Sequence, residues 1–154
     1  MDLKKIVAAV DFSDTSLLAL ETAYSLASET GATLYLLHVI DEHLLAPIGP
    51  LRLTMAELRE QREKQLEELI PENWDESMPI ERVVIEGDPP SAVAEFALNN
   101  NADMIVAGTH GRKGVARVLM GSTAEKLLRE APCQVLVVKP HKSAVSEPDA
   151  EAQA

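Results

Sequence analysis

Glycines at wide, uneven intervals, followed by two hydroxyl side chains, are the residues of this chain best suited to chemistry. They lie in the stretch GTHGRKGVARVLMGST. Gly108 and Gly111 let the backbone approach a ligand closely, because glycine has no side chain. Gly121, Ser122 and Thr123 come where a helix should begin, and the unpaired N–H groups and positive dipole end of a helix bind anions. The pattern suggests that the anion is a phosphate.

Two cationic residues support a phosphate site, although the familiar phosphate motifs are absent. Arg112 and Lys113 add positive charge within the stretch, and Arg112 is a candidate to contact the anion. The P-loop spacing GxxxxGK followed by Ser or Thr does not occur, and neither does GxGxxG. On the residues alone, a structural alternative stays open in which the glycines only make turns and Ser122 only caps its helix.

Two hydrophobic periodicities alternate along the chain and predict the elements that position this stretch. Short runs rich in β-branched residues predict strands over residues 4–10, 33–39, 82–86, 103–108 and 134–139. Apolar residues at helical spacing predict a helix between each strand and the next. Most of the strands are apolar on both faces, which is typical of strands covered by helices on two sides.

Local signals predict where the helices begin and end. Ser13 or Asp14 caps the first helix, and Gly31 stops it. The second helix covers roughly residues 54–70, and the third follows the sequence GDPP and turns Val93, Ala94, Ala97 and Leu98 inward. The fourth runs from near Ser122 to about residue 130, and the Ser122 hydroxyl with Glu125 three residues later predicts a capping box.

The alternation of strands and helices predicts an α/β fold, a Rossmann-like open sheet of five parallel strands with helices on both faces. The usual strand order for such a sheet is 3-2-1-4-5, which reverses direction between strands 1 and 4. Ligands bind outside the carboxyl ends of the strands at that switch point. The loop DFSD follows strand 1 and the loop GTHGRKG follows strand 4, so both should lie at the crevice.

Composition sets limits on the class of protein. Of the 154 residues, 46% are hydrophobic and no apolar run approaches a membrane span, so we expect a soluble domain over residues 1–140. The acidic tail, residues 141–154, has too few large apolar residues to pack and is expected to be disordered. Cys133 is the sole cysteine, which suits a reducing cytoplasm. The formal net charge of −11 disfavours nucleic acid and anionic lipid as partners.

Gly108, Gly111, Gly121 and Ser122 fit the spacing G-x2-G-x9-G-S/T, which resembles the ATP-binding signature of the universal stress protein family. The resemblance covers about residues 3–140 and includes IVAAVDFSDTS, LLHVI, EGDPPSAV and APCQVLVVKP. It implies a Rossmann-like domain that binds ATP, with the ribose and adenine near the acidic residue after strand 1 and the triphosphate along the glycine motif.

The resemblance also implies a role for each matching residue. Asp11 would contact the ribose or adenine, and the backbone of Val39 the edge of the adenine. The glycines at 108 and 111 would lie under the ribose and phosphates, and residues 121–123 would hold the β- and γ-phosphates. Structural alternatives stay open, since Asp11 could cap the first helix, Val39 could be only a sheet residue, and Thr123 could be a spare hydroxyl.

The histidines do not predict a metal site. His110 lies at a variable position of the motif and is interpreted as a polar loop residue, while His38, His43 and His141 are scattered over a strand, a loop and the tail. This spacing is not that of a zinc site. A metal would more plausibly be Mg²⁺, arriving with the phosphates of the nucleotide.

The motifs admit three classes of function. Catalysis needs a positioned base or nucleophile in addition to a phosphate cradle, and the sequence offers no dedicated one, so the first hypothesis is a regulatory ATP-binding module with at most slow hydrolysis. RNA binding through GRKG, which matches the GXXG loop of KH domains, is disfavoured because that loop follows a strand here and because the chain is acidic.

The third class is an interaction protein whose output is its dimer, independent of nucleotide. Residues Gln134 to Val138 form an apolar strand that the expected order places at a sheet edge, and a second copy would cover it. The family resemblance also implies homodimers through this strand. The loop DEHLLAPIGPLR follows strand 2 at the ligand end of the sheet, and is interpreted as a lid.

Overall fold

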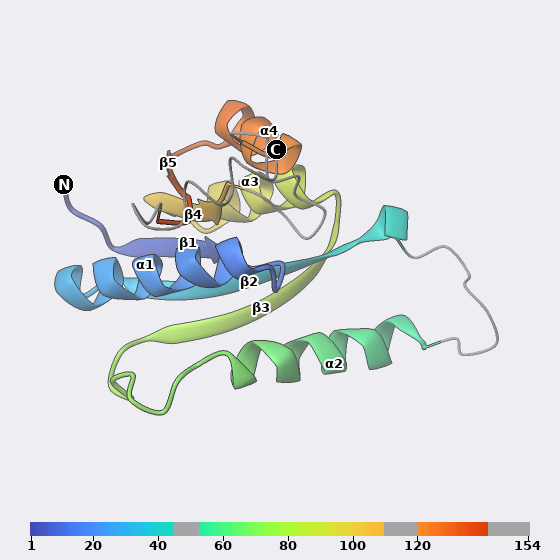
Figure 1. Cartoon of the computed structure of the whole chain (residues 1–154), viewed down its shortest axis with the longest axis horizontal. Helices are drawn as coiled ribbons and strands as arrows, with labels where there is room; N and C mark the ends of the chain where they lie inside the picture. Colours follow the sequence, from blue (N-terminus) through green and yellow to red (C-terminus); the bar gives the residue numbers. More distant parts are fainter. Residues whose placement is uncertain (45–52, 110–119, 142–154) are drawn as a thin grey trace, which may run out of the picture.

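Parallel strands and α-helices alternate along the chain, as the two periodicities predict. The computed structural model describes residues 1–44, 53–109 and 120–141 (Figure 1). Its elements, in chain order, are β1 (Lys5–Ala9), α1 (Asp14–Thr30), β2 (Thr33–Asp41), the 3-10 helix η1 (Glu42–Leu44), α2 (Met55–Glu68), β3 (Ile80–Gly87), α3 (Pro89–Asn99), β4 (Met104–Gly108), α4 (Ser122–Glu130) and β5 (Gln134–Val138).

The sheet has the order β3-β2-β1-β4-β5, and every neighbouring pair of strands is parallel. The predicted order is therefore confirmed. The central strand β1 pairs with β2 on one side, with Lys5 opposite Thr33, and with β4 on the other, with Ile6 opposite Met104. Successive strands are added toward one edge of the sheet from β1 to β3 and toward the other edge from β4 onward. The switch point therefore lies between β1 and β4, where the sequence predicts it.

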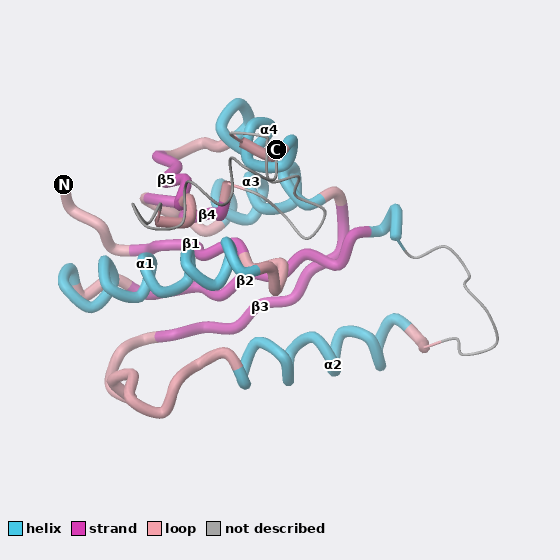
Figure 2. Tube along the Cα trace, in the orientation of Figure 1, coloured by secondary structure: helices cyan, strands magenta, loops and turns pink. Residues whose placement is uncertain are grey.

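Helices cover both faces of the sheet, and each face has its own apolar core (Figures 1 and 2). On one face, Ala19, Leu20 and Ala23 of α1 and Leu66 of α2 pack on the strands. On the other face, Val93 and Ala97 of α3 and Leu127 of α4 do so. Because the strands are buried on both sides, their sequences read as continuous apolar runs.

The helices begin with different local devices. Ser13 is the N-cap of α1, and Gly31 ends that helix with a left-handed φ of 75°, so both expected signals are confirmed. Helix α2 begins with a capping box that the sequence analysis did not identify. The Thr54 hydroxyl accepts from the Glu57 N–H at 3.1 Å, and the Glu57 carboxylate accepts from the Thr54 N–H at 3.0 Å.

Two helix predictions are wrong. Ser122 and Glu125 do not form a capping box, because Gly121 is the N-cap of α4 and no side chain of the described residues caps this helix. Glu125 instead accepts a hydrogen bond from Arg129, one turn further along, at 2.7 Å. Leu98 does not point inward and is 62% exposed, because it lies about 100° around the helix from the buried Ala97.

The two edges of the sheet differ in their protection. At the β3 edge, Arg59 of α2 donates to the Val84 carbonyl at 2.9 Å and to the Glu86 carboxylate at 3.2 Å. The guanidinium therefore satisfies a carbonyl that an unpaired edge strand would expose. Strand β5 pairs with β4 on one side and forms the opposite edge, and four of its five residues are partly exposed.

Asp103 joins the amino ends of β1 and β4, and its replacement should destabilise the fold. One carboxylate oxygen accepts from the N–H groups of Lys4 and Lys5, at 2.8 and 2.9 Å. Hydrogen bonds to a charged acceptor stabilise a fold more than neutral ones, but the bond from Lys4 is exposed to solvent and contributes less than the bond from Lys5. We therefore expect Asp103→Ala to lower the free energy of unfolding by about 2 kcal/mol. Urea unfolding followed by Trp74 fluorescence measures this.

The fluorescence reporter suits the measurement, because Trp74 is the sole tryptophan and stacks on Tyr24 at 3.9 Å between ring centroids. The control is Asp2→Ala. Asp2 forms an ion pair with Lys4 in which both side chains are more than three-quarters exposed, so its loss should leave the midpoint unchanged. An equal effect of both substitutions would contradict the role given to Asp103.

Several predictions fall outside the described residues. These are the binding roles of Gly111 and Arg112, the interpretation of His110, most of the lid loop, and the disorder of the tail over 142–154.

Candidate functional site

The turn between β1 and α1 forms one wall of the switch point. The Asp11 carboxylate accepts hydrogen bonds from the N–H and the hydroxyl of Ser13, the former at 2.9 Å. Ser13 in turn accepts from the Ser16 N–H at 3.2 Å. The cap of α1 is therefore Ser13, and Asp11 braces it. Both carboxylate contacts use Oδ1, which leaves Oδ2 of a half-buried carboxylate at the carboxyl end of β1.

Phe12 holds this turn in an uncommon backbone conformation. Its φ of 66° lies in the left-handed region, which a bulky residue enters at a cost of about 1 to 2 kcal/mol. The Phe12 ring packs on the buried His38 of β2 at 4.8 Å between ring centroids. Contacts with β2 thus support the turn that carries Asp11. The sequence analysis considered His38 only as a metal ligand and did not consider Phe12.

Gly108 is required by packing at the end of β4. A Cβ atom at this position would lie 2.7 Å from the Thr15 hydroxyl oxygen and 2.8 Å from the Thr15 carbonyl carbon. The N-terminal turn of α1 therefore approaches the β4 backbone more closely than any other residue type would allow. Thr15 is a second residue that the sequence analysis missed, and a contact between distant parts of the chain has no signal in local sequence.

Hydrogen bonds at the end of β4 place the start of α4 at the switch point. The Gly121 N–H donates to the Thr109 carbonyl, and the Thr109 N–H donates to the Val138 carbonyl of β5 at 2.9 Å. Thr109 itself is buried. The structure thus brings the last glycine of the motif beside the residue that follows Gly108, although 110–119 lie outside the described residues.

The start of α4 differs from those of the other helices in the part of the chain that the structure describes. The first N–H groups of any helix lack partners within the helix. In α1 and α2, side chains cap them, and α3 begins with two prolines, which have no N–H. Helix α4 has neither device, and its exposed Ser122 and Thr123 follow the Gly121 N-cap. Its N-terminus can therefore receive an anion.

The backbone of Val39 lies just beyond the end of the β1–β2 ladder. In a parallel sheet, alternate residues direct their N–H and C=O toward alternate neighbours. Thr33 N–H donates to Lys4 and Val10 N–H donates to Leu37, so odd-numbered residues of β2 face β1. Val39 is the next residue of that set, and the register of β1 with β2 ends at Leu37. Among the described contacts, its backbone has no ladder partner on this side.

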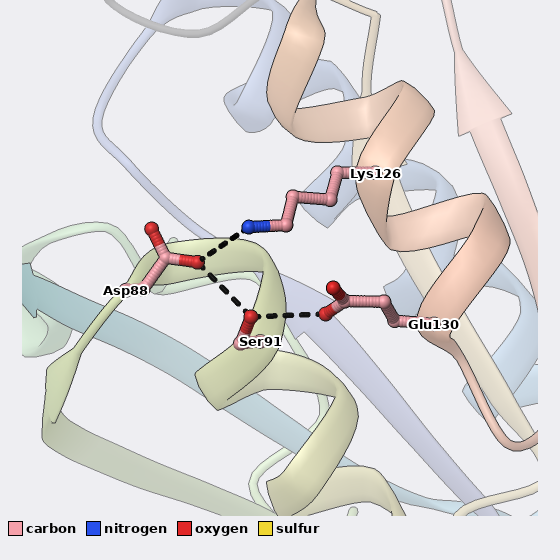
Figure 3. Close-up of polar contacts among 4 residues, drawn as sticks. All are labelled: Asp88, Ser91, Lys126 and Glu130. Atoms are coloured by element: carbon pink, nitrogen blue, oxygen red, sulfur yellow. Dashed lines mark hydrogen bonds and ion pairs between the residues drawn. The ribbon is translucent and has the colours of Figure 1, made fainter.

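A polar cluster links α4 to the start of α3 (Figure 3). Lys126 of α4 lies 3.3 Å from the Asp88 carboxylate, and the Ser91 hydroxyl lies 3.0 Å from Asp88 and 2.9 Å from Glu130. Partial burial acts to raise the pKa of Asp88, but the hydrogen bonds from Ser91 and Lys126 and the charges of Lys126 and His43 outweigh it and lower that pKa. The ionised Asp88 therefore persists to lower pH, and the cluster holds α4 against α3.

The outer face of α4 lines an open depression of about 360 Å³, formed by Ser122, Glu125, Lys126, Arg129 and Glu130. Its mixed charges are largely paired with one another or with α3. Apart from Ser122, this surface does not include the residues of the β1–β4 switch point, and we assign the candidate site to the switch point on the geometry of the backbone.

The described residues lack the features of two other types of site. No cluster of three or more His, Cys, Asp or Glu side chains there could hold a metal ion. None of the helices in the described ranges is long and apolar enough to cross a membrane.

A parallel sheet of this order, with helices on both faces and a switch point between β1 and β4, defines the Rossmann-like class of fold. The sequence model of the universal stress protein family matches residues 2–139. The chain belongs to this family, as the motif spacing indicated.

Individual relatives agree. Universal stress protein MJ0531 of Methanocaldococcus jannaschii is 37% identical over 144 residues, covering 90% of this chain and 84% of the relative. The solved structure of protein MJ0577 of the same organism has a TM-score of 0.77 and 25% identity, covering 93% of this chain and all of that one. The universal stress protein of Archaeoglobus fulgidus in complex with dAMP has a TM-score of 0.57 and 22% identity, covering 90% of this chain and all of that one.

Proposed function

We propose that this protein binds an adenine nucleotide, with ATP as its ligand, at the β1–β4 switch point. The observation that supports this most strongly is the start of α4. It is held to the end of β4 by the Gly121–Thr109 hydrogen bond, and its N–H groups are not capped by any side chain of the described residues. Backbone donors and the helix dipole together favour phosphate.

The opposite side of the crevice suits a nucleoside. The N–H and C=O of Val39, which have no ladder partner among the described residues, can donate to and accept from the edge of a base, while Oδ2 of Asp11 can accept a hydrogen bond from a ribose hydroxyl. Gly108 lies between these groups and the phosphates, although its contact with Thr15 gives it a structural role as well. The dAMP complex of a protein with this fold supports adenine as the base.

The proposed output is regulatory binding in a stress response and not rapid turnover. Phosphoryl transfer requires a group that positions and activates the nucleophile, in addition to the groups that hold the phosphates. The first described residues of α4 are a glycine and two hydroxyl residues, the Glu125 carboxylate of its first turn is bonded to Arg129, and Asp11 is proposed to contact the ribose. Mg²⁺ would be held mainly by the phosphates themselves, since this ion takes few protein ligands.

Calorimetric titration of nucleotide-stripped protein tests the proposal. We expect Mg-ATP to bind, AMP to bind more weakly because it lacks the phosphates that reach α4, and GTP to bind more weakly still because its base presents a different edge to Val39. Absence of heat with ATP at several temperatures would overturn the proposal. Turnover at the rate of a committed ATPase would overturn its regulatory part.

We also propose a homodimer through the free edge of β5. Because Val138 C=O accepts from the Thr109 N–H of β4, even-numbered residues of β5 face β4, and Val135 and Val137 direct their backbone groups to the open edge. The matching strand of a second copy would pair with these groups and cover the partly exposed side chains.

Val137→Pro should convert the dimer to a folded monomer. Proline removes the outward N–H of residue 137 but no hydrogen bond of the β4–β5 ladder. Sedimentation velocity should show the wild type as a dimer and the variant at half its mass, with the same Trp74 emission. Val138→Pro is the control, because it removes an N–H that faces β4, and this variant should lose the fold as well as the dimer. A wild-type monomer at all concentrations would contradict the proposal.

A further inference from the structure

His38 is a buried polar residue whose side chain bonds to the backbone of the switch point. It is 6% exposed, and its Nδ1 lies 2.7 Å from the Val10 carbonyl oxygen. A carbonyl oxygen can only accept, so Nδ1 carries the proton and donates. The interaction joins β2 to the residue that immediately precedes Asp11.

The acceptor that His38 uses is the one that the sheet would otherwise give to Val39. Val39 faces β1, as Leu37 does, and in a continued parallel ladder its N–H would donate to the Val10 carbonyl. In the structure, the ladder stops after the bond from Val10 N–H to the Leu37 carbonyl, and the Val10 carbonyl accepts from the imidazole.

The same imidazole also supports the turn that follows. The Phe12 ring packs on it at an angle of 49°, and Phe12 is the residue whose φ of 66° needs support from its surroundings. The turn then leads directly to the hydrogen bonds between Asp11 and Ser13. One side chain thus acts on both groups that form the nucleoside side of the crevice.

We propose that His38 is a positioning residue that ends the β1–β2 ladder early and so leaves the Val39 N–H open for a base. By donating to the Val10 carbonyl it removes the partner of that N–H, and by packing on Phe12 it holds Asp11 in place. This inference rests on the proposed function for its purpose, but the diversion of the Val10 carbonyl is a property of the protein without ligand and can be tested there.

Amide hydrogen exchange of the ligand-free protein tests the diversion directly. We expect the Val39 amide to exchange at least tenfold faster than the Leu37 amide, which is in the ladder. In His38→Phe, the ring against Phe12 is kept but the donor is lost, so the Val39 amide should pair with the Val10 carbonyl and exchange about tenfold more slowly. A Val39 amide already as protected as that of Leu37 in the wild type would overturn the inference.

Nucleotide affinity tests the consequence, and a conservative variant separates it from general destabilisation. His38→Phe should weaken ATP binding about tenfold, the effect of losing about one hydrogen bond. His38→Asn should restore most of the affinity, because its amide nitrogen can reach the position of Nδ1 and donate to Val10. Leu36→Ala, a fully buried substitution on the same face of β2, controls for lost core packing and should lower stability without changing the Val39 exchange rate.

The outcomes distinguish the two proposals. If the wild type does not bind nucleotide but the exchange rates follow the expected pattern, the proposed function fails and the role of His38 in ending the ladder stands. If ATP binds and His38→Phe changes neither exchange nor affinity, the proposed function stands and the role of His38 fails. Failure of His38→Asn to recover affinity while Leu36→Ala weakens binding equally would also overturn it, because both effects would then follow from stability alone.

Discussion

Gly121→Val should abolish ATP binding and leave the fold intact. Gly121 has φ −69° and ψ 160°, an extended conformation that valine adopts readily, so the substitution does not strain the backbone. The branched side chain would stand at the N-cap of α4, over the N–H groups that are proposed to hold phosphates. Losing two charge-assisted hydrogen bonds of about 1.5 to 3 kcal/mol each predicts an affinity at least about a hundredfold lower.

The measurement is calorimetric titration with Mg-ATP, accompanied by the Trp74 unfolding curve to show that the variant is folded. Glu125→Ala is the matched control. Glu125 lies in the first turn of the same helix, and its replacement removes a negative charge, so binding of an anion should be unchanged or tighter. Wild-type affinity in Gly121→Val would place the phosphates elsewhere and remove the main support for the proposed site.

The order of the sheet and the place of the crevice could be predicted from sequence because both depend on signals that repeat. Apolar β-branched runs separated by helical patterns define the alternation, and the handedness of parallel crossovers then leaves few arrangements. The loops that carry Asp11 and Gly108 follow from that order without any motif. The motif spacing added the family, which the comparisons confirm.

Local signals were less reliable where a distant contact determined the outcome. Ser122 and Glu125 have the sequence of a capping box, but the N-cap is Gly121, whose N–H is already bonded to Thr109. Thr54 and Glu57 make the box that local sequence also permits, because each side chain accepts a hydrogen bond from the backbone N–H of the other residue. Such a competition cannot be read from a window of a few residues, since one partner lies outside it.

The role of His38 illustrates a second limit. Its sequence neighbours predict a buried strand, and a histidine there is unexpected only as a polar residue in an apolar run. Its partners Val10 and Phe12 are reached through the pairing of two strands, and the consequence for Val39 depends on which backbone groups face which strand. These facts require the register, which sequence patterns do not supply.

Gly108→Ala should destabilise the fold and remove nucleotide binding together. The added Cβ would lie 2.7 to 2.9 Å from three atoms of Thr15, including its carbonyl carbon, so a change of the Thr15 rotamer cannot relieve the contact. Helix α1 must move away from β4, and with it the turn that carries Asp11. Overpacking of this kind costs about 3 kcal/mol, and urea unfolding followed by Trp74 fluorescence measures it.

Gly31→Ala separates this cause from the general cost of replacing a glycine. Gly31 has a φ of 75° and nothing within 4 Å of an added Cβ, so its replacement should cost about 1 kcal/mol through the backbone alone and leave ATP affinity unchanged. Gly108 lacks a positive φ, and any larger loss there must come from the contact with Thr15. Equal stability of Gly108→Ala and the wild type would mean that α1 can move away from β4 at no cost. The contact between Thr15 and Gly108 would then not hold the turn after β1 in place.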